Sequence, residues 1–203
     1  MQRSFFIQSD VVNVARSLIG KFLFSNSEGE VTGGVIVETE AYCEACDLAM
    51  QTHLQRRPSS VETLKSQGGI AYIYTVYGYH SMFNIVTNER DNADSVLIRA
   101  IKPTVGVDVM KVRRGLNTPS NNLCSGPAKM SQALALNPKL NGVSVLGTLK
   151  NERSVWVEDR DFQITEEEII SSPRVGIDYA KQDAKLPWRF RLNPKSSSYK
   201  KAQ

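Results

Sequence analysis

Apolar positions near the start of the chain recur at the spacing of one helix face, and Asp10 stands before them as a helix cap. Gly20 follows them, and glycine is common just past the end of a helix. The apolar positions are Val11, Val12, Ala15, Leu18 and Ile19. This pattern predicts a helix over residues 10–19.

Runs rich in β-branched and aromatic residues follow, with turn-forming clusters between them. The runs cover residues 21–24, 34–39, 71–77, 82–87 and 95–101. A polar cluster at residues 26–29 separates the first two runs and predicts a hairpin, and Gly78 lies in the turn between the next two. We therefore expect a mainly antiparallel sheet, with Glu40 at the end of a strand.

The rest of the chain predicts a long loop, two helices and three short strands. Residues 50–69 are polar and lack periodicity, which favours a loop. Pro103 and Pro127 stand where proline can begin a helix, and a polar loop is expected between those helices at residues 116–122. The short strands are expected near residues 143–146, 155–157 and 189–192.

Composition is ordinary for a soluble globular protein, since the 203 residues are 41% hydrophobic and 23% charged. We expect one domain over residues 1–194 and a disordered basic tail over residues 195–203. No apolar run is long enough to cross a bilayer, and the N-terminus lacks a signal-peptide core. Three cysteines, an odd number, favour reduced thiols in an intracellular protein. The net charge of +4 favours an anionic partner without establishing one.

Two carboxylates and a phenol alternate along one predicted strand. In an extended strand Glu38, Glu40 and Tyr42 share a face. Burial beside an aromatic ring would raise the pKa of a carboxyl group toward neutrality and suit it to general-base catalysis. A solvent-exposed acidic strand face explains the same pattern without any chemistry.

Four of the seven tyrosines lie in a single predicted strand and its turn. They are Tyr72, Tyr74, Tyr77 and Tyr79. Alternating aromatic residues often pack in a core, but tyrosines beside a glycine turn can also stack on bases or wedge into a duplex. Taken alone, this cluster leaves both interpretations open.

Five motifs in order along the chain resemble the alkyladenine (3-methyladenine) DNA glycosylase family. They are V-E-T-E-A-Y at 37–42, Y-I-Y-T-V-Y-G-Y-H-S-M-F-N-I-V at 72–86, V-L-I-R-A-I-K-P at 96–103, L-C-S-G-P-A-K-M-S-Q-A-L at 123–134 and R-V-G-I at 174–177. The resemblance implies a single mixed α/β (α+β) domain, with a curved antiparallel sheet flanked by helices and a protruding hairpin that inserts into DNA. It also implies a monofunctional DNA glycosylase of base excision repair that removes alkylated purines without a cofactor.

The resemblance assigns catalysis to three residues. Glu40 matches the carboxylate that deprotonates the water attacking the sugar. Arg99 and the backbone carbonyl of Val175 match groups that hold this carboxylate and its water in place. The predicted general base of the strand motif is thus the family's catalytic glutamate.

Recognition of the damaged base is assigned to four further residues. Tyr77 matches the residue that intercalates where the nucleotide has left the stack. Tyr42 and Tyr74 match the aromatic rings that sandwich the flipped base, and cation–π attraction favours bases made cationic by alkylation. Asn84 matches the pocket residue that obstructs the amino group of guanine.

Two positions match the family less directly. The G-P-A-K motif at 126–129 is expected to bring a helix N-terminus and Lys129 to the DNA backbone, although a purely structural helix start explains it nearly as well. The family's pocket histidine falls on Gln51, with His53 two residues away. We favour Gln51 as the pocket residue, which predicts altered handling of ethenoadenine and hypoxanthine.

The C-x-x-C pair of Cys43 and Cys46 departs from the family's sequence after the catalytic strand. Such a pair can be redox-active or can bind a metal ion. A second paired motif that would complete a zinc site is lacking, so two thiols in a loop are the simpler interpretation. We expect no metal site.

Two rival functions use the same motifs. A catalytically silent nucleic-acid-binding module would keep the fold but would not need Glu40, Arg99 and Asn84 together. A bifunctional glycosylase/lyase would need an amine nucleophile, and the matched catalytic motifs supply none. We therefore expect an enzyme that acts as a monomer on double-stranded DNA containing damaged purines, inside the cell and away from membranes.

Overall fold

The computed structural model describes residues 1–116, 122–147 and 153–201. In this part of the chain eight strands form one sheet, and every strand pair is antiparallel. The strands are β1 (Phe22–Ser27), β2 (Glu30–Tyr42), β3 (Ala71–Val76), β4 (His80–Thr87), β5 (Asp94–Val105), β6 (Arg153–Glu158), β7 (Ile169–Ser172) and β8 (Arg189–Leu192). The α-helices are α1 (Val11–Ser17), α2 (Leu48–Arg56), α3 (Val61–Leu64), α4 (Val107–Arg113), α5 (Pro127–Ala133) and α6 (Ser197–Lys201). The expected mixed α/β fold is confirmed.

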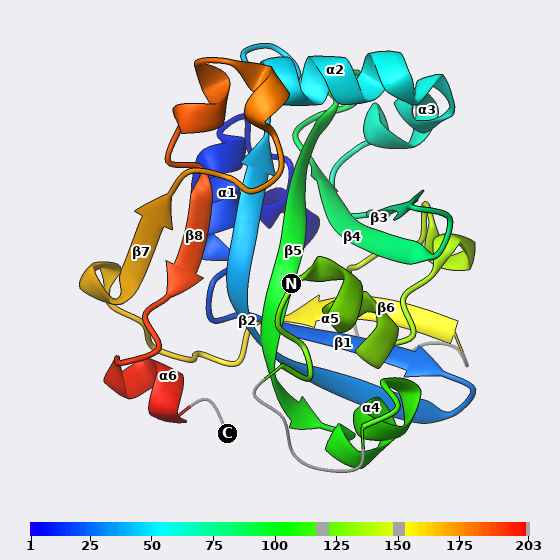
Figure 1. The fold of residues 1–203 in the computed structure, drawn as a ribbon, viewed down its shortest axis with the longest axis vertical. Coiled ribbons are helices and arrows are strands. Elements are labelled where there is room, and N and C mark those ends of the chain that lie inside the picture. Colours follow the sequence, from blue (N-terminus) through cyan, green and yellow to red (C-terminus); the bar gives the residue numbers. More distant parts are fainter. Residues whose placement is uncertain (117–121, 148–152, 202–203) are drawn as a thin grey trace.

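Strand β2 is the centre of the sheet. The order across the sheet is β3-β4-β5-β2-β1-β6, and β8 pairs with the part of β2 that holds Glu38, Thr39 and Glu40. In Figure 1, β1 and β6 cross the lower part of the view while β5 and β8 stand upright, so the sheet is strongly curved. The pairing of β2 with β5 shifts register on both sides of Glu38. Such irregularities bend a strand and redirect its side chains, and here they flank Glu38, one of the two predicted carboxylates.

Helices cover the sheet from both sides. α1 packs on β2 and β5 behind the sheet, and α5 packs on β4 and β5 in front of it (Figure 1). Val14 of α1 and Met130 of α5 are fully buried against the strands. Removing such apolar side chains from water is the main stabilising contribution to the fold, so the central strands form a rigid platform.

The β3–β4 hairpin ends in an exposed aromatic turn. Tyr77 and Gly78 both have positive φ, at 53° and 80°, and the Tyr79 N–H donates to the Val76 carbonyl at 3.3 Å. Two successive left-handed residues are typical of a primed hairpin turn, which matches the twist of its strands. A tyrosine in this backbone conformation is unfavourable compared with glycine, and such residues concentrate at functional sites.

Most elements predicted from the sequence are confirmed. α1, the β1–β2 hairpin, the strands β3, β4 and β5, α5, β6 and β8 lie where the patterns of apolar residues indicated. The polar loop expected at residues 116–122 falls largely outside the described residues. None of the helices in the described part of the chain is long and apolar enough to span a membrane.

The prediction of a long loop over residues 50–69 is wrong for residues 50–64. These residues lie in α2, a 3-10 turn (Pro58–Ser60) and α3, whereas residues 65–69 form neither helix nor strand. Asp47 caps α2 by accepting from the Ala49 N–H at 3.0 Å, and α2 buries only Ala49 and Met50. A helix with so few buried positions shows no clear apolar period, because its location depends on contacts with distant segments.

Three other predictions also need correction. Pro103 lies in β5 next to a register shift, where a strand tolerates proline, and α4 begins only after Gly106 turns the chain with a φ of 68°. Residues 143–146 form no strand, only a single bridge between Ser144 and Ile70. The tail predicted as disordered contains α6, because Ser198 is buried and bonds to the Glu168 carboxylate at 2.7 Å.

Candidate active site

Glu40 lies in the interior of the sheet, in β2 between β5 and β8, and its relative exposure is 0%. Its Oε1 accepts a hydrogen bond from the Val175 amide at 2.8 Å. Its Oε2 accepts from the Tyr42 hydroxyl at 2.8 Å and from Arg99 Nη1 at 3.2 Å. The carboxylate is thus held in one orientation by three donors from three different chain segments. A solvent-exposed acidic strand face is excluded for Glu40.

Burial raises the pKa of Glu40 above its ordinary value, and burial is the largest influence on that pKa. Arg99, the Val175 amide and the Tyr42 hydroxyl act in the opposite direction, because each stabilises the charged carboxylate. The effect of burial outweighs these three groups, so the Glu40 carboxylate binds a proton more strongly than a carboxylate in water. That property is what general-base catalysis near neutral pH requires.

A second carboxylate supports the first through a shared arginine. Arg99 Nε donates to Glu38 Oε1 at 2.8 Å, and Arg189 Nε donates to the same oxygen at 2.7 Å. Arg99 therefore bridges Glu38 and Glu40, and the two carboxylates face two guanidinium groups. This charge balance fixes the Arg99 head group against Glu40 and leaves no net charge on the four side chains.

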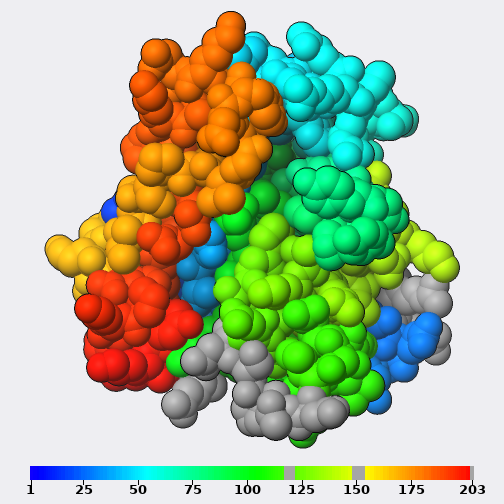
Figure 2. Space-filling model, in the orientation of Figure 1, coloured from blue at the N-terminus to red at the C-terminus, as the bar shows by residue number. Residues whose placement is uncertain are grey.

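A cavity opens beside Glu40, and Figure 2 shows the surface hollowed between α2 in cyan, the β3–β4 hairpin in teal and the segment of residues 174–179 in orange. Glu40 itself lies just behind the cavity wall. Residues that line the cavity include Tyr42, His53, Tyr74, Asn84, Arg99 and Val175. Five predicted site residues, which are separated by up to 133 positions (42 to 175) in sequence, therefore share one cavity.

Val175 occupies its predicted place but contributes a different atom to Glu40. The resemblance assigns the backbone carbonyl of Val175, whereas the group that bonds Glu40 in the structure is the Val175 amide N–H. Because an N–H can only donate, this contact stabilises the charged carboxylate. The role of the carbonyl toward a water molecule stays a prediction.

Gln51 lies outside the cavity, which corrects the interpretation that it replaces the pocket histidine. It is exposed, and its amide nitrogen donates to the Glu44 carbonyl at 3.0 Å. The reason is the phase of α2, since residues four apart share a helix face and Ala49 and His53 therefore point the same way. Both line the cavity, whereas Gln51 points away from it. His53, the alternative considered from the sequence, is the residue in the cavity wall.

His53 is held in the wall by aromatic contacts and a hydrogen bond. Its ring lies 4.7 Å from that of Tyr74 and edge-on to it, and its Nε2 is 2.7 Å from the Tyr72 hydroxyl. The Tyr72 hydroxyl is also 2.6 Å from the Ser60 hydroxyl, and if Tyr72 donates to Ser60, the matching tautomer of His53 has its proton on Nε2. Burial and the neighbouring Arg57 lower the pKa of His53 to about 4. His53 is therefore neutral at pH 7, and in the tautomer with the proton on Nε2 its Nδ1 is an acceptor.

Asn84 is placed by the sheet in the wall of the same cavity. It lies in β4 opposite Tyr72 of β3 and Leu97 of β5, and it is buried. Its amide nitrogen donates to the carbonyl groups of Tyr72 and Met82 at 3.3 and 3.1 Å. These bonds fix the side chain, so that it forms a rigid part of the cavity wall.

Two predicted DNA contacts lie outside the cavity. Tyr77 is 83% exposed at the tip of the β3–β4 hairpin, and Tyr79 beside it is 74% exposed. Lys129 is exposed on α5, whereas Pro127 at the start of that helix reaches the cavity. The structure leaves the roles of Tyr77 and Lys129 in DNA binding as predictions.

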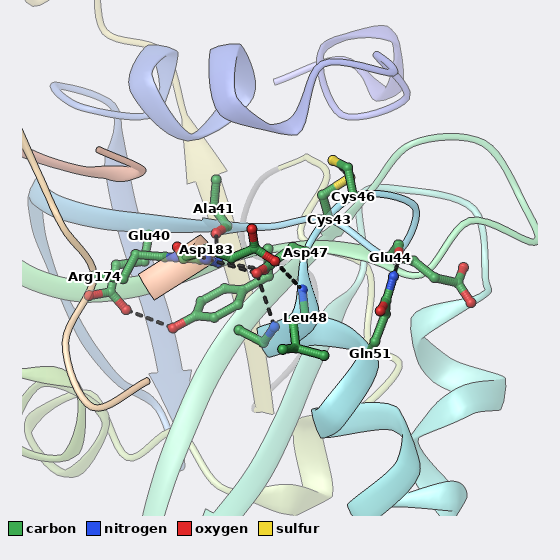
Figure 3. A network of polar contacts seen from close by, with 12 residues as sticks. Glu40, Ala41, Cys43, Glu44, Cys46, Asp47, Leu48, Gln51, Arg174 and Asp183 are labelled. Carbon is green, nitrogen blue, oxygen red and sulfur yellow. Dashed lines mark hydrogen bonds and ion pairs between the residues drawn. The ribbon is translucent and has the colours of Figure 1, made fainter. Parts of the chain in front are cut away.

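The buried ion pair between Asp47 and Arg174 was not predicted from the sequence. Figure 3 shows Arg174 beside Asp47 at the connection between β2 and α2. Arg174 belongs to the R-V-G-I motif and immediately precedes Val175, and its guanidinium lies 4.8 Å from the Tyr42 ring. A lone arginine in a short motif carries no sign of burial. The signal available was its position next to an assigned catalytic residue.

The described part of the chain contains no group of three or more potential metal ligands among histidine, cysteine, aspartate and glutamate. Cys43 and Cys46 follow the catalytic strand, and both are free thiols. His53 belongs to the cavity wall instead of joining them.

Comparisons with known proteins find similarity over nearly the whole chain. A family model described as methylpurine-DNA glycosylase matches residues 5–196. A relative from Chlamydia abortus (strain DSM 27085 / S26/3) is 41% identical over 197 residues, which are 97% of this chain and 100% of the relative. Relatives from Natranaerobius thermophilus and Clostridium perfringens (strain 13 / Type A) are 36% and 34% identical and cover 93% and 91% of this chain and 94% and 92% of their own. All three carry the name "Putative 3-methyladenine DNA glycosylase".

Proposed function

The chain belongs to the methylpurine-DNA glycosylase family, and we propose that it is a monofunctional DNA glycosylase that releases alkylated purines of the 3-methyladenine type during base excision repair. The observation that carries this proposal is the buried carboxylate of Glu40, which three donors hold behind the wall of an aromatic cavity. A protein that only binds DNA has no need of such a carboxylate.

The reaction assigned to Glu40 is the activation of water. As the bond between the purine and the sugar breaks, positive charge develops on the sugar ring, and a water molecule attacks the anomeric carbon. Glu40 accepts the proton of that water, and the purine leaves with the electron pair of the broken bond. Arg99 and the Val175 amide keep the carboxylate oriented for this proton transfer.

The target base has to leave the helix before this chemistry is possible. The exposed ring of Tyr77 at the hairpin tip suits insertion into the gap that the nucleotide leaves. Tyr42 and Tyr74 line the cavity and offer faces to a purine made cationic by alkylation. Asn84, a buried part of the cavity wall, is assigned the exclusion of an additional amino group on the base.

We assign to His53 a hydrogen bond with the edge of the flipped base. We assign the tautomer in which the Nε2–H bonds to Tyr72, so that the free Nδ1 favours a base edge that donates, such as an exocyclic amino group. Hypoxanthine carries an oxygen in place of the adenine amino group and lacks this donor. Lesions that keep the amino group of adenine are therefore the preferred substrates.

Water is the nucleophile in this proposal because no lysine lines the cavity in the part of the chain that the structure describes. A bifunctional enzyme would form a Schiff base between an amine and the sugar. Trapping with borohydride on damaged duplex DNA distinguishes the two, since a covalent protein–DNA product would overturn the monofunctional assignment.

We also propose that the enzyme acts inside the cell, on genomic DNA, and that it does so as a monomer.

The test uses DNA methylated with a radiolabelled methylating agent, from which the released bases are separated by chromatography. The native protein is expected to release 3-methyladenine, and Glu40→Gln is expected to lose roughly 100- to 10,000-fold in rate. Glu62→Gln, at an exposed position on α3, is the matched control and keeps full activity. Normal DNA binding without base release by the native protein would favour the silent binding module instead.

A further inference from the structure

Two cysteines stand together where the catalytic strand ends. Cys43 is half-buried and Cys46 is exposed, and both belong to the connection from β2 to α2. Their sulfur atoms are 2.6 Å apart, and Figure 3 shows them side by side. A disulfide bond is about 2.05 Å long, so a small movement of either side chain brings the sulfurs to bonding distance.

The backbone between the two cysteines is held by Glu44. The Glu44 N–H donates to Asp94 at 2.8 Å, and the Glu44 carboxylate accepts from the Ala93 N–H at 2.8 Å and pairs with Lys65 at 3.0 Å. The Glu44 carbonyl accepts the Gln51 amide at 3.0 Å. These contacts tie the middle of the connection to β5, to α2 and to the segment after α3.

The two ends of the connection are fixed as well. Before Cys43, Tyr42 pairs with Ser95 of β5 as the last residue of β2. After Cys46, Asp47 is fully buried in its ion pair with Arg174. Both cysteines are therefore held near each other by contacts that do not involve sulfur. A disulfide bond between them would restrict little additional backbone.

We propose that Cys43 and Cys46 form a reversible oxidation site, in which peroxide converts the two thiols to a disulfide and a dithiol reductant restores them. The overall reaction takes two thiols and one hydrogen peroxide to one disulfide and two water molecules. Two electrons pass from the sulfur atoms to the peroxide oxygens, whose mutual bond breaks. The site does not depend on the proposed glycosylase function.

The exposure of the two thiols sets the order of steps. Cys46 meets the peroxide first because it is exposed, and its sulfur becomes a sulfenic acid. Burial raises the pKa of the Cys43 thiol to about 12, so Cys43 stays protonated and unreactive toward peroxide in solution. The Cys43 sulfur then attacks the Cys46 sulfur, and its proton leaves with the hydroxyl of the sulfenic acid as water.

The third cysteine cannot take part in this reaction. Cys124 is buried, and its sulfur donates toward Met110 at 3.6 Å in the core between α4 and the sheet. Burial raises the pKa of the Cys124 thiol to about 12. It therefore serves as an internal reference that stays reduced in the folded protein.

The experiment treats the full-length folded protein with a modest excess of hydrogen peroxide, unfolds it in an alkylating agent and measures its mass. One alkylated cysteine, Cys124, and the loss of two hydrogen atoms are expected, and dithiothreitol treatment before alkylation restores three alkylated cysteines. Cys124→Ser is expected to form the same disulfide. Cys43→Ser and Cys46→Ser are expected to form none.

Thermal unfolding is the second measurement. Oxidised native protein should melt a few degrees above the reduced form, because the bond limits the unfolded chain, while Cys46→Ser should melt at one temperature with or without peroxide. Three alkylated cysteines after peroxide would overturn the proposal. So would Cys46 oxidised to sulfinic acid beside a free Cys43, or a disulfide that links two protein molecules.

Discussion

The carboxylate of Asp47 and the guanidinium of Arg174 form a two-pronged ion pair from which solvent is excluded. Asp47 Oδ2 lies 2.5 Å from Arg174 Nη1 and Asp47 Oδ1 lies 2.8 Å from Nη2, and both side chains are 0% exposed. Arg174 also donates to the Ala41 carbonyl at 2.8 Å and to the Asp183 carbonyl at 3.2 Å. The pair therefore joins β2, the start of α2 and the segment that carries Val175.

The position of this ion pair links the stability of the fold to the geometry of the site. Asp47 caps α2, the helix that carries His53, while Arg174 lies against the Tyr42 ring and directly precedes Val175. Tyr42, His53 and Val175 line the cavity, and each lies next to Arg174 or on the helix that Asp47 caps. A change at either charge is expected to act on the cavity as well as on folding.

Removing one partner of the ion pair should destabilise the protein strongly. Arg174→Met leaves the Asp47 carboxylate buried without its counter-charge, which costs about 3–5 kcal/mol of unfolding free energy. The double variant Asp47→Asn/Arg174→Met should be more stable than Arg174→Met, because it leaves no unpaired charge buried while asparagine can still cap α2. Urea unfolding of Arg174→Met, Asp47→Asn and the double variant measures the coupling between the two residues. Additive effects of the two changes would contradict the role of the pair.

The pH dependence of base release should report the environment of Glu40. The general base must be ionised, so kcat/KM falls as pH drops through the pKa of Glu40, which burial raises. In Tyr42→Phe the carboxylate loses a donor that lowers this pKa, so the acid limb of the profile should move to higher pH. The profile of kcat/KM against pH for the two proteins checks the direction of the shift. A move of the limb to lower pH would exclude Glu40 as the titrating base.

Gln51 and His53 provide a matched pair for base recognition. Gln51→Ala should leave the relative release of different lesions unchanged, because this side chain lies outside the cavity. His53→Ala removes one acceptor from the wall and should lower the release of lesions with an amino group by about 3- to 10-fold, the effect of one hydrogen bond. Rates on ethenoadenine, hypoxanthine and methylated duplexes measure the selectivity of each variant. A changed selectivity in Gln51→Ala alone would restore the original interpretation of that residue.

The hairpin tip should contribute to activity on duplex DNA and not to stability. Tyr77→Ala removes a ring that makes few contacts in the free protein, so its melting temperature should stay close to that of the native protein. Its rate on a duplex lesion should fall by roughly 5- to 150-fold, the effect of one lost aromatic stacking contact of about 1–3 kcal/mol. Tyr79→Ala is the neighbouring control and should lose less, because its backbone lacks the left-handed turn that projects Tyr77. Equal losses in both variants would argue against Tyr77 as the inserted residue.

Local patterns were sufficient for the elements that carry most of the site. Alternation along one strand placed Glu38, Glu40 and Tyr42 on a common face, and the structure confirms this through the contacts of Arg99 and Tyr42 with Glu40. Proline at the start of α5 and glycine in the β3–β4 turn were equally informative. These signals depend on neighbouring residues only, since strand alternation and turn conformation follow from the backbone of a few positions.

Properties that depend on residues far apart in the sequence could not be predicted from such local patterns. Whether His53 or Gln51 faces the cavity depends on the phase of α2, and the capping residue of α2, Asp47, is held by Arg174, which is 127 positions away. The pKa of Glu40 depends on how completely β5, β8 and the Val175 segment exclude water from it. The sequence by itself determined the family, the antiparallel sheet and the carboxylate at its centre. Only the tertiary structure decided which side chains line the cavity and how strongly that carboxylate holds a proton, because burial and long-range contacts arise when separate segments pack together.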